Sequence, residues 1–174
     1  DLQPFVRSWR LAVGWHLLDW GLLDAAQDWL GRARKAAPKD PEVLVALGAV
    51  YTAAARGVAP AGARAAAARY SGLSLFQARE RAFDVLKEVL AADPVDEEAW
   101  FRRALLNRYL GEMSAARRDF EWLLERSRDS WKLYLSHLML GAMDEDAGRR
   151  PEAIVHYRAA AGLEPSSPTA RFAL

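Results

Sequence analysis

The side chains that could do chemistry are few in this chain, and they form no recognisable catalytic or metal-binding pattern. The three histidines are His16, His137 and His156, and no two of them lie four residues apart, the spacing that places two metal ligands on one face of a helix. We therefore expect them at the surface or in a satisfied interior rather than around a metal ion. The chain has no cysteine, which excludes disulfides, thiolate catalysis and most structural zinc sites.

One acidic cluster lies at the end of a predicted helix. Asp144, Glu145 and Asp146 are consecutive, and the helix dipole disfavours negative charge at this end. Such a cluster could bind a cation or an arginine, but we favour a solvated helix end. Gly141 and Gly148 are seven residues apart and do not form a phosphate-binding loop. Because no residue is nominated for catalysis, we predict a protein without enzymatic activity, cofactor or bound metal.

The charge balance argues against nucleic acid as a partner. The 174 residues include 24 Lys and Arg against 23 Asp and Glu, a formal net charge of +1. Interleaved acids and bases create no field that gathers polyanions. The densest basic stretch, residues 102–118, is surrounded by acidic residues, so we interpret it as an ion-paired, solvated helix surface.

The sequence predicts no membrane insertion. Its most apolar stretch, residues 11–30, is interrupted by His16 and three aspartates, whereas a membrane span needs roughly 20 apolar residues. The chain opens with Asp1 rather than methionine. We favour a soluble protein exported after cleavage of a leader, periplasmic or extracellular, over a cytoplasmic one.

The elements that would position any site are set by a pattern that recurs four times. A small residue is followed by a second small residue and, four positions later, by a large apolar one, and proline closes three of the units at Pro38, Pro94 and Pro165. Small residues suit the points where two helices cross closely, and proline ends the second helix. The aligned residues are Gly14, Ala26 and Leu30; Gly48, Ala82 and Leu86; Ala104, Ala116 and Phe120; and Gly141, Ala153 and Tyr157.

This pattern resembles the tetratricopeptide repeat (TPR), whose unit is about 34 residues long. The second unit carries Leu44, Leu47, Gly48 and Tyr51 in the family's order. The resemblance implies an all-α fold, a right-handed α-solenoid of about four helix-turn-helix repeats forming a single domain over residues 1–174. We expect repeats at 7–40, 41–96, 97–130 and 134–167, with an incomplete tail helix at 168–174. Their helices are predicted at 4–20, 22–36, 41–56, 75–92, 96–110, 114–126 (with Ser114 as N-cap), 130–146 and 150–162.

The second repeat carries a long insertion. Between Gly48 and Ala82 there are 34 positions, where the family pattern has about 12. We assign the extra residues to 57–72. Long loops in repeat arrays are variable or functional, so two interpretations stay open: a tolerated surface loop, or a flap that covers a groove or contacts a partner.

The resemblance also implies a concave surface lined by the first helix of each repeat, which commonly binds an extended peptide or a partner helix. Members that grip an acidic C-terminus carry Lys and Asn where this chain has Leu11 and Trp15, which contradicts that function here. Leu11 and Trp15 could line an exposed apolar groove. The alternative is that they belong to an inner core covered by N-terminal residues or by the insertion. The predicted partner-binding groove consists of Leu11, Trp15, Val45, Ala49, Phe101, Leu105, Arg108, Tyr109, Leu138 and Ala142.

We therefore predict a non-enzymatic scaffold that binds an apolar helix or peptide of another protein in this groove. The alternative is a structural subunit that assembles head to tail into an oligomer or filament. The first repeat is rich in tryptophan, a residue enriched in interface hot spots. The possible assembly surface consists of Trp9, Trp20, Tyr157 and Phe172.

Overall fold

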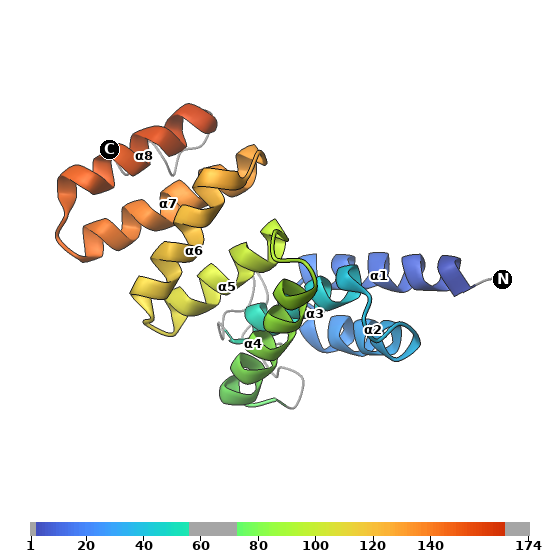
Figure 1. Ribbon diagram of the computed structural model, residues 1–174. Helices are drawn as coiled ribbons and strands as arrows, with labels where there is room; N and C mark the ends of the chain where they lie inside the picture. Colours follow the sequence, from blue (N-terminus) through green and yellow to red (C-terminus); the bar gives the residue numbers. More distant parts are fainter. Residues whose placement is uncertain (1–2, 56–72, 166–174) are drawn as a thin grey trace. The chain divides into compact units, whose positions relative to one another are not determined.

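The computed structural model describes residues 3–55 and 73–165, and every regular element within these ranges is an α-helix. In the same ranges, none of the helices combines the length and hydropathy needed to span a lipid bilayer. The chain forms two compact units, residues 1–106 and 107–174. The helices are α1 (Gln3–Asp19), α2 (Leu23–Ala36), α3 (Pro41–Ala55), α4 (Leu75–Ala92), α5 (Glu97–Tyr109), α6 (Met113–Arg126), α7 (Ser130–Asp146) and α8 (Arg150–Leu163) (Figure 1).

Helices that follow one another in the chain pack together as hairpins within each unit. In the first unit α1 packs against α2 and α3 against α4, and both α1 and α2 also contact α3. In the second unit α7 packs against α8, and α6 contacts α7. The predicted helix boundaries are confirmed to within one residue at each end.

One predicted helix start is wrong in detail. Ser114 lies inside α6, which begins at Met113 with Glu112 as its N-cap residue. The hydrogen bonding sets this start, because the carbonyl of Glu112 already accepts from the backbone N–H of Ala116 at 2.9 Å. The insertion 57–72, the tail 168–174 and Phe172 lie outside the described residues, and the repeat boundaries stay a prediction.

Glycines in the left-handed region form three of the turns between consecutive helices. Gly21, Gly111 and Gly148 have φ angles of 73°, 80° and 74°, and they follow α1, α5 and α7. A side chain at such an angle would clash with its own backbone, so glycine is the residue that turns here without strain. The same local solution therefore recurs at equivalent places along the chain.

Small residues of the repeat pattern lie where the helices of the α1–α2 and α3–α4 hairpins cross. A Cβ atom built on Gly14 would lie 2.5 Å from Leu30, and one on Gly48 would lie 2.9 Å from Leu86. Ala26 is fully buried. The prediction that small residues are required at these crossings is confirmed, because a larger side chain has no room there.

An aspartate begins the first helix of three hairpins. Asp40 accepts hydrogen bonds from the backbone N–H groups of Glu42 and Val43, and Asp96 accepts one from that of Ala99 at 2.7 Å. Asp129 accepts from the first turn of α7 in the same way. These carboxylates satisfy backbone donors that have no partner inside the helix, and their charge suits its positive end.

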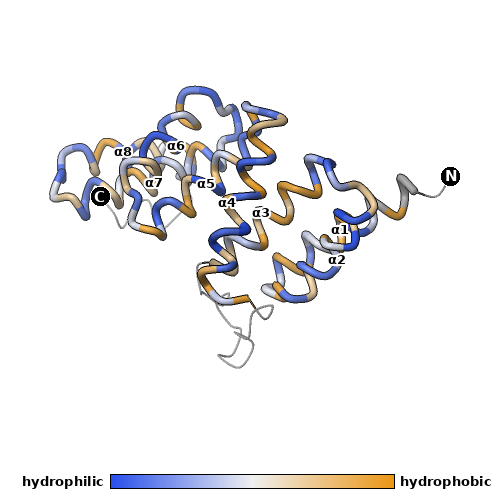
Figure 2. The backbone as a smooth tube through the Cα atoms, turned by 60° about the horizontal axis from the view of Figure 1, so that its bottom comes forward, coloured by the Kyte–Doolittle hydropathy of each residue, from blue (hydrophilic) through white to orange (hydrophobic). Residues whose placement is uncertain are grey.

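Each unit has its own core. In the first unit α3 is buried on nearly all sides, and Figure 2 shows mainly hydrophobic residues along it. In the second unit Tyr134 and Leu138 of α7 pack with Ala153, Tyr157 and Ala160 of α8. A helix that is apolar all round belongs in an interior, so α3 is the helix around which the first unit is built.

Candidate functional site

The first unit contains a hollow of about 720 Å³ beside α1 and α3. Its apolar members are the more enclosed, since Val45 is buried and Leu11 and Trp15 are half-buried. Its acidic members lie nearer to solvent, with Glu42 and Asp93 exposed. The lining residues are Leu11, Trp15, Pro41, Glu42, Val45, Asp93, Asp96 and Glu98. The hollow, hereafter the α1–α3 hollow, therefore combines an apolar floor with an acidic rim.

Hydrogen bonds hold two residues of the acidic rim in place. Asp93 accepts from the backbone N–H of Val95 at 3.1 Å, and Glu98 accepts from Nε of Arg102 at 2.7 Å. Burial raises the pKa of Asp96, and the charges of Asp93 and Glu98 raise it further against the opposing hydrogen bond from Ala99. The rise contributed by its acidic neighbours indicates a locally negative potential.

The structure brings three of the predicted groove residues, Leu11, Trp15 and Val45, together in this hollow. Ala49 has to be corrected, because it is fully buried in α3 and offers no surface to a partner. Phe101 and Leu105 of α5 are also buried.

The four predicted groove residues that lie in the second unit differ in how deeply they are buried. Leu138 is largely buried in the core between α7 and α8, and its part in a groove stays a prediction. Arg108, Tyr109 and Ala142 are half-buried, and their part in a groove stays a prediction.

The residues assigned to an assembly surface differ in how exposed they are. Trp9 of α1 is 50% exposed, and Trp20 in the turn after α1 is 70% exposed. Tyr157 is buried against Gly141 in the core of the α7–α8 hairpin, so it does not present its ring to another copy. Its Oη donates to Glu145 at 2.8 Å, and burial followed by this bond raises its pKa to about 12.

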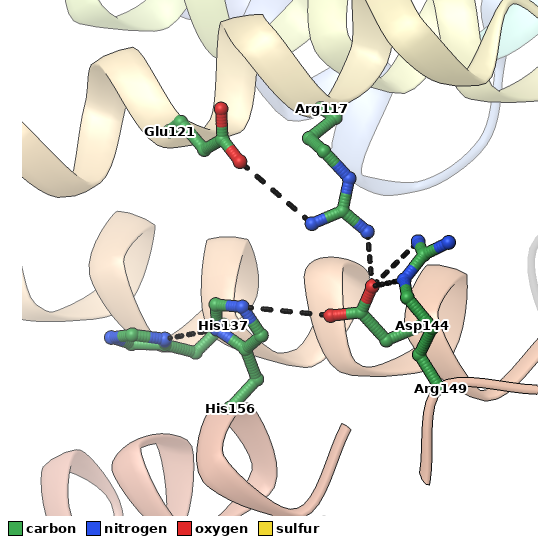
Figure 3. Close-up of polar contacts among 6 residues, drawn as sticks. All are labelled: Arg117, Glu121, His137, Asp144, Arg149 and His156. Carbon is green, nitrogen blue, oxygen red and sulfur yellow. Dashed lines mark hydrogen bonds and ion pairs between the residues drawn. The ribbon is translucent and has the colours of Figure 1, made fainter. Parts of the chain in front are cut away.

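The second unit encloses a polar cluster that the sequence did not predict (Figure 3). Asp144, at the end of α7, is 1% exposed. Its Oδ1 accepts from Arg149 Nε at 2.9 Å and Nη2 at 2.7 Å, and from Arg117 of α6. Burial alone would raise the pKa of Asp144, but the hydrogen bonds from Arg149 and Arg117 hold it below its ordinary value. The cluster therefore ties α6 to the end of α7.

Two histidines extend this cluster along the α7–α8 hairpin. Nδ1 of His137 and Nδ1 of His156 are 3.0 Å apart, and Nε2 of His156 lies 3.7 Å from Oδ2 of Asp144. At this distance one of the two Nδ1 atoms donates to the other, and the tautomers of the two rings set the direction. Burial lowers the pKa of both imidazoles, and the charge of His156 lowers that of His137 further.

Asp144, Arg117 and Glu121 also act on the pKa of His156, the two acids raising it and Arg117 lowering it. Within the described residues no group of three His, Asp or Glu side chains is placed to hold a metal ion. The arrangement is a paired charge beside a neutral imidazole pair, which suits a stabilising network.

The expected solvated helix end is thus wrong for Asp144, and the pairing of His137 with His156 was missed. A signal for both exists in the repeat pattern. His137 and Asp144 lie four residues before and three residues after Gly141, and His156 lies three residues after Ala153. Residues at these spacings share a helix face, so all three face the crossing of the hairpin.

Comparison with known proteins finds similarity in structure only. No protein-family model matches the chain, and no curated protein matches it. The solved structure of MamA from MSR-1 (C2) has a TM-score of 0.60 at 22% identity and covers 90% of this chain and 75% of its own. The structure of MamA from AMB-1 has a TM-score of 0.56 at 22% identity, over 91% of this chain and 73% of its own.

A further similar structure is TTC0263, a thermophilic TPR protein of Thermus thermophilus. It has a TM-score of 0.55 at 21% identity, and the match covers 95% of each chain. Together with the helix hairpins described above, this likeness defines the class of fold. The chain has the all-α fold of a TPR solenoid, as the repeat pattern predicts.

Proposed function

We propose that the protein is a non-enzymatic interaction scaffold, and that the α1–α3 hollow binds an apolar helix or extended peptide of another protein. The observation that carries the proposal is the meeting of Leu11, Trp15 and Val45 in one hollow. Two of the three keep exposed surface, and a half-buried indole beside aliphatic side chains is a typical anchor point in protein interfaces.

The packing of the unit supports a preformed site. Val45 belongs to α3, which is held in the core of the unit, and α1 contacts both α2 and α3. A partner that enters the hollow therefore meets side chains on packed helices and loses little free energy in ordering them. The TPR fold is itself consistent with a scaffold, although the partner has to be identified by its chemistry.

The test is selection of peptides from a random library displayed on phage, with the full chain as bait. Leu11→Asp places a charge on the apolar floor. Leu22→Asp is the matched control, because Leu22 is exposed at the N-cap of α2, where aspartate is favoured. We expect the selected peptides to bind wild type and Leu22→Asp but to lose at least about tenfold in affinity for Leu11→Asp, which is about 1.4 kcal/mol. Equal affinity for both variants would overturn the proposal.

A second candidate function, self-assembly, is favoured by the exposure of Trp9 and Trp20. Large exposed aromatic side chains are costly in a monomer and common in interfaces. Light scattering across protein concentration tests it without any added partner. Mass that grows with concentration in wild type, and not in a Trp9→Gln, Trp20→Gln variant, supports assembly, whereas a wild-type monomer at high concentration refutes it.

A further inference from the structure

The charge around the α1–α3 hollow narrows the chemistry of its occupant. Resting on the proposed function, we infer that the bound segment is cationic as well as apolar: an apolar side chain of a partner protein, flanked by Lys or Arg residues that face the acidic rim. The apolar side chain fills the floor at Leu11, Trp15 and Val45, and the cationic groups lie against Glu42, Asp93 and Asp96.

The composition of the lining supports this partner. Of the eight described residues that line the hollow, four are acidic and none is basic. The chain as a whole is balanced, with a net charge of +1, so the rim departs from the average surface. Complementary charge around an apolar contact selects partners and speeds their encounter.

Several of these carboxylates also serve the fold. Asp93 and Asp96 accept hydrogen bonds from neutral backbone amides, which leave the negative charge in place. Glu42 and Glu98 lie in the first turns of α3 and α5, where acidic side chains complement the helix dipole. Arg102 already pairs with Glu98 at 2.7 Å. This pairing lowers the contribution of Glu98 to the negative charge of the rim.

The surroundings of Asp96 give independent support. It is half-buried, and after burial the nearby charges of Asp93 and Glu98 add to the rise of its pKa. Like charges held this close repel one another, and a cation placed among them relieves that repulsion. Binding of a cationic segment should therefore weaken as the pH falls and Asp96 takes up a proton.

The experiment uses three short synthetic peptides labelled with fluorescein. All three have the same central Leu and Trp residues and differ only in their flanking residues, which are Lys, Gln or Glu. Fluorescence anisotropy with the full chain measures each affinity at low and at high salt. We expect the Lys peptide to bind roughly three- to tenfold more tightly than the Gln peptide at low salt, and the Glu peptide to bind most weakly. The preference should shrink at high salt.

The rim variant is Glu42→Gln combined with Asp96→Asn, since asparagine also caps a helix. Its matched control is Asp24→Asn combined with Glu80→Gln, which removes two exposed acids of the same unit that do not line the hollow. The rim variant should lose the preference for Lys over Gln and keep its affinity for the Gln peptide. The control variant should keep both the preference for the Lys peptide and the affinity for the Gln peptide.

The outcomes separate this inference from the proposed function. If the Gln peptide binds and Leu11→Asp abolishes its binding, but wild type shows no preference for Lys, the cationic partner is refuted and the scaffold stands. If none of the peptides binds, both fail. If the chain without peptide is a dimer that Leu11→Asp converts to a monomer, the occupant is a second copy and the inference is overturned.

Discussion

Replacing Gly141 by alanine tests the rule on which the repeat alignment depends. The added Cβ would lie 2.5 Å from Cε1, 2.7 Å from Cδ1 and 3.0 Å from Cζ of Tyr157, well inside van der Waals contact. The ring is buried, and its Oη is held by Glu145 at 2.8 Å, so it cannot move aside freely. Overpacking costs about 1–3 kcal/mol, and three close ring atoms favour the upper end.

Alanine also gains about 1 kcal/mol over glycine in helix propensity. The net expectation is therefore a loss of about 2 kcal/mol in the second unit. Gly162→Ala is the matched control in α8, because no described atom lies within 4 Å of its added Cβ. That variant should be neutral or slightly more stable.

The assay is urea unfolding followed by circular dichroism, combined with hydrogen exchange of the amides of α7 and α8. Hydrogen exchange reports the local free energy of opening, which matters because the two compact units could unfold separately. If Gly141→Ala opens no more readily than Gly162→Ala, the close crossing is not a constraint and the alignment of small residues loses its physical basis.

The other predictions concern the polar contacts of the second unit. Asp144→Asn should cost about 2 kcal/mol in urea unfolding, less than the roughly 3–5 kcal/mol of a fully buried pair, because Arg149 is half-exposed. Since the folded pKa values of His137 and His156 lie below the ordinary 6.5, the unfolded chain binds more protons near this pH. Stability should fall as the pH drops below about 6.5, and His137→Gln should make the pH dependence of the urea midpoint shallower. Tyr157→Phe should lose about 1 kcal/mol and remove the tyrosinate absorbance that develops near pH 12.

Each of these has an outcome that contradicts it. An Asp144→Asn variant as stable as wild type would mean that the two arginines are solvated independently of the carboxylate. A urea midpoint that does not change between about pH 7 and pH 5 would refute the neutral histidine pair. Unchanged stability of Tyr157→Phe would show that the bond to Glu145 adds nothing in solution.

The helices and their crossings could be predicted because they follow from local rules. The spacing from Gly14 to Ala26 and Leu30 is repeated in the later units, apart from the insertion in the second, and the structure puts Gly14, Gly48 and Gly141 at close helix crossings. Proline and glycine end helices for steric reasons that do not depend on the rest of the fold. The helix boundaries follow directly.

The polar cluster could not be predicted by the search for paired ligands within one helix. His137 and His156 lie on different helices and meet across the hairpin. Their contact depends on the register of that hairpin, which the crossing of Gly141 with Tyr157 sets. A search that combined helix-face spacing with the crossing positions would have placed His137, His156 and Asp144 together.

The acidic rim could not be predicted from the sequence for a different reason. Asp93 and Asp96 are far from Leu11 in the sequence, and aspartates beside a helix start are explained by capping alone. Only the packing of the first unit brings them to the same hollow as Trp15. The groove residue Ala49 is wrong because a repeat position identifies a helix face but not how deeply that face is buried.

Nuclear magnetic resonance of the indole N–H groups tests the central claim most directly. Trp15 lines the α1–α3 hollow, whereas Trp131 is exposed on α7 of the second unit and serves as an internal reference. Titration with the Lys-flanked peptide should shift the Trp15 signal in a saturable manner and leave that of Trp131 unchanged. A peptide that binds while the Trp15 signal stays in place, or that shifts only Trp9, Trp20 or Trp131, would contradict the account.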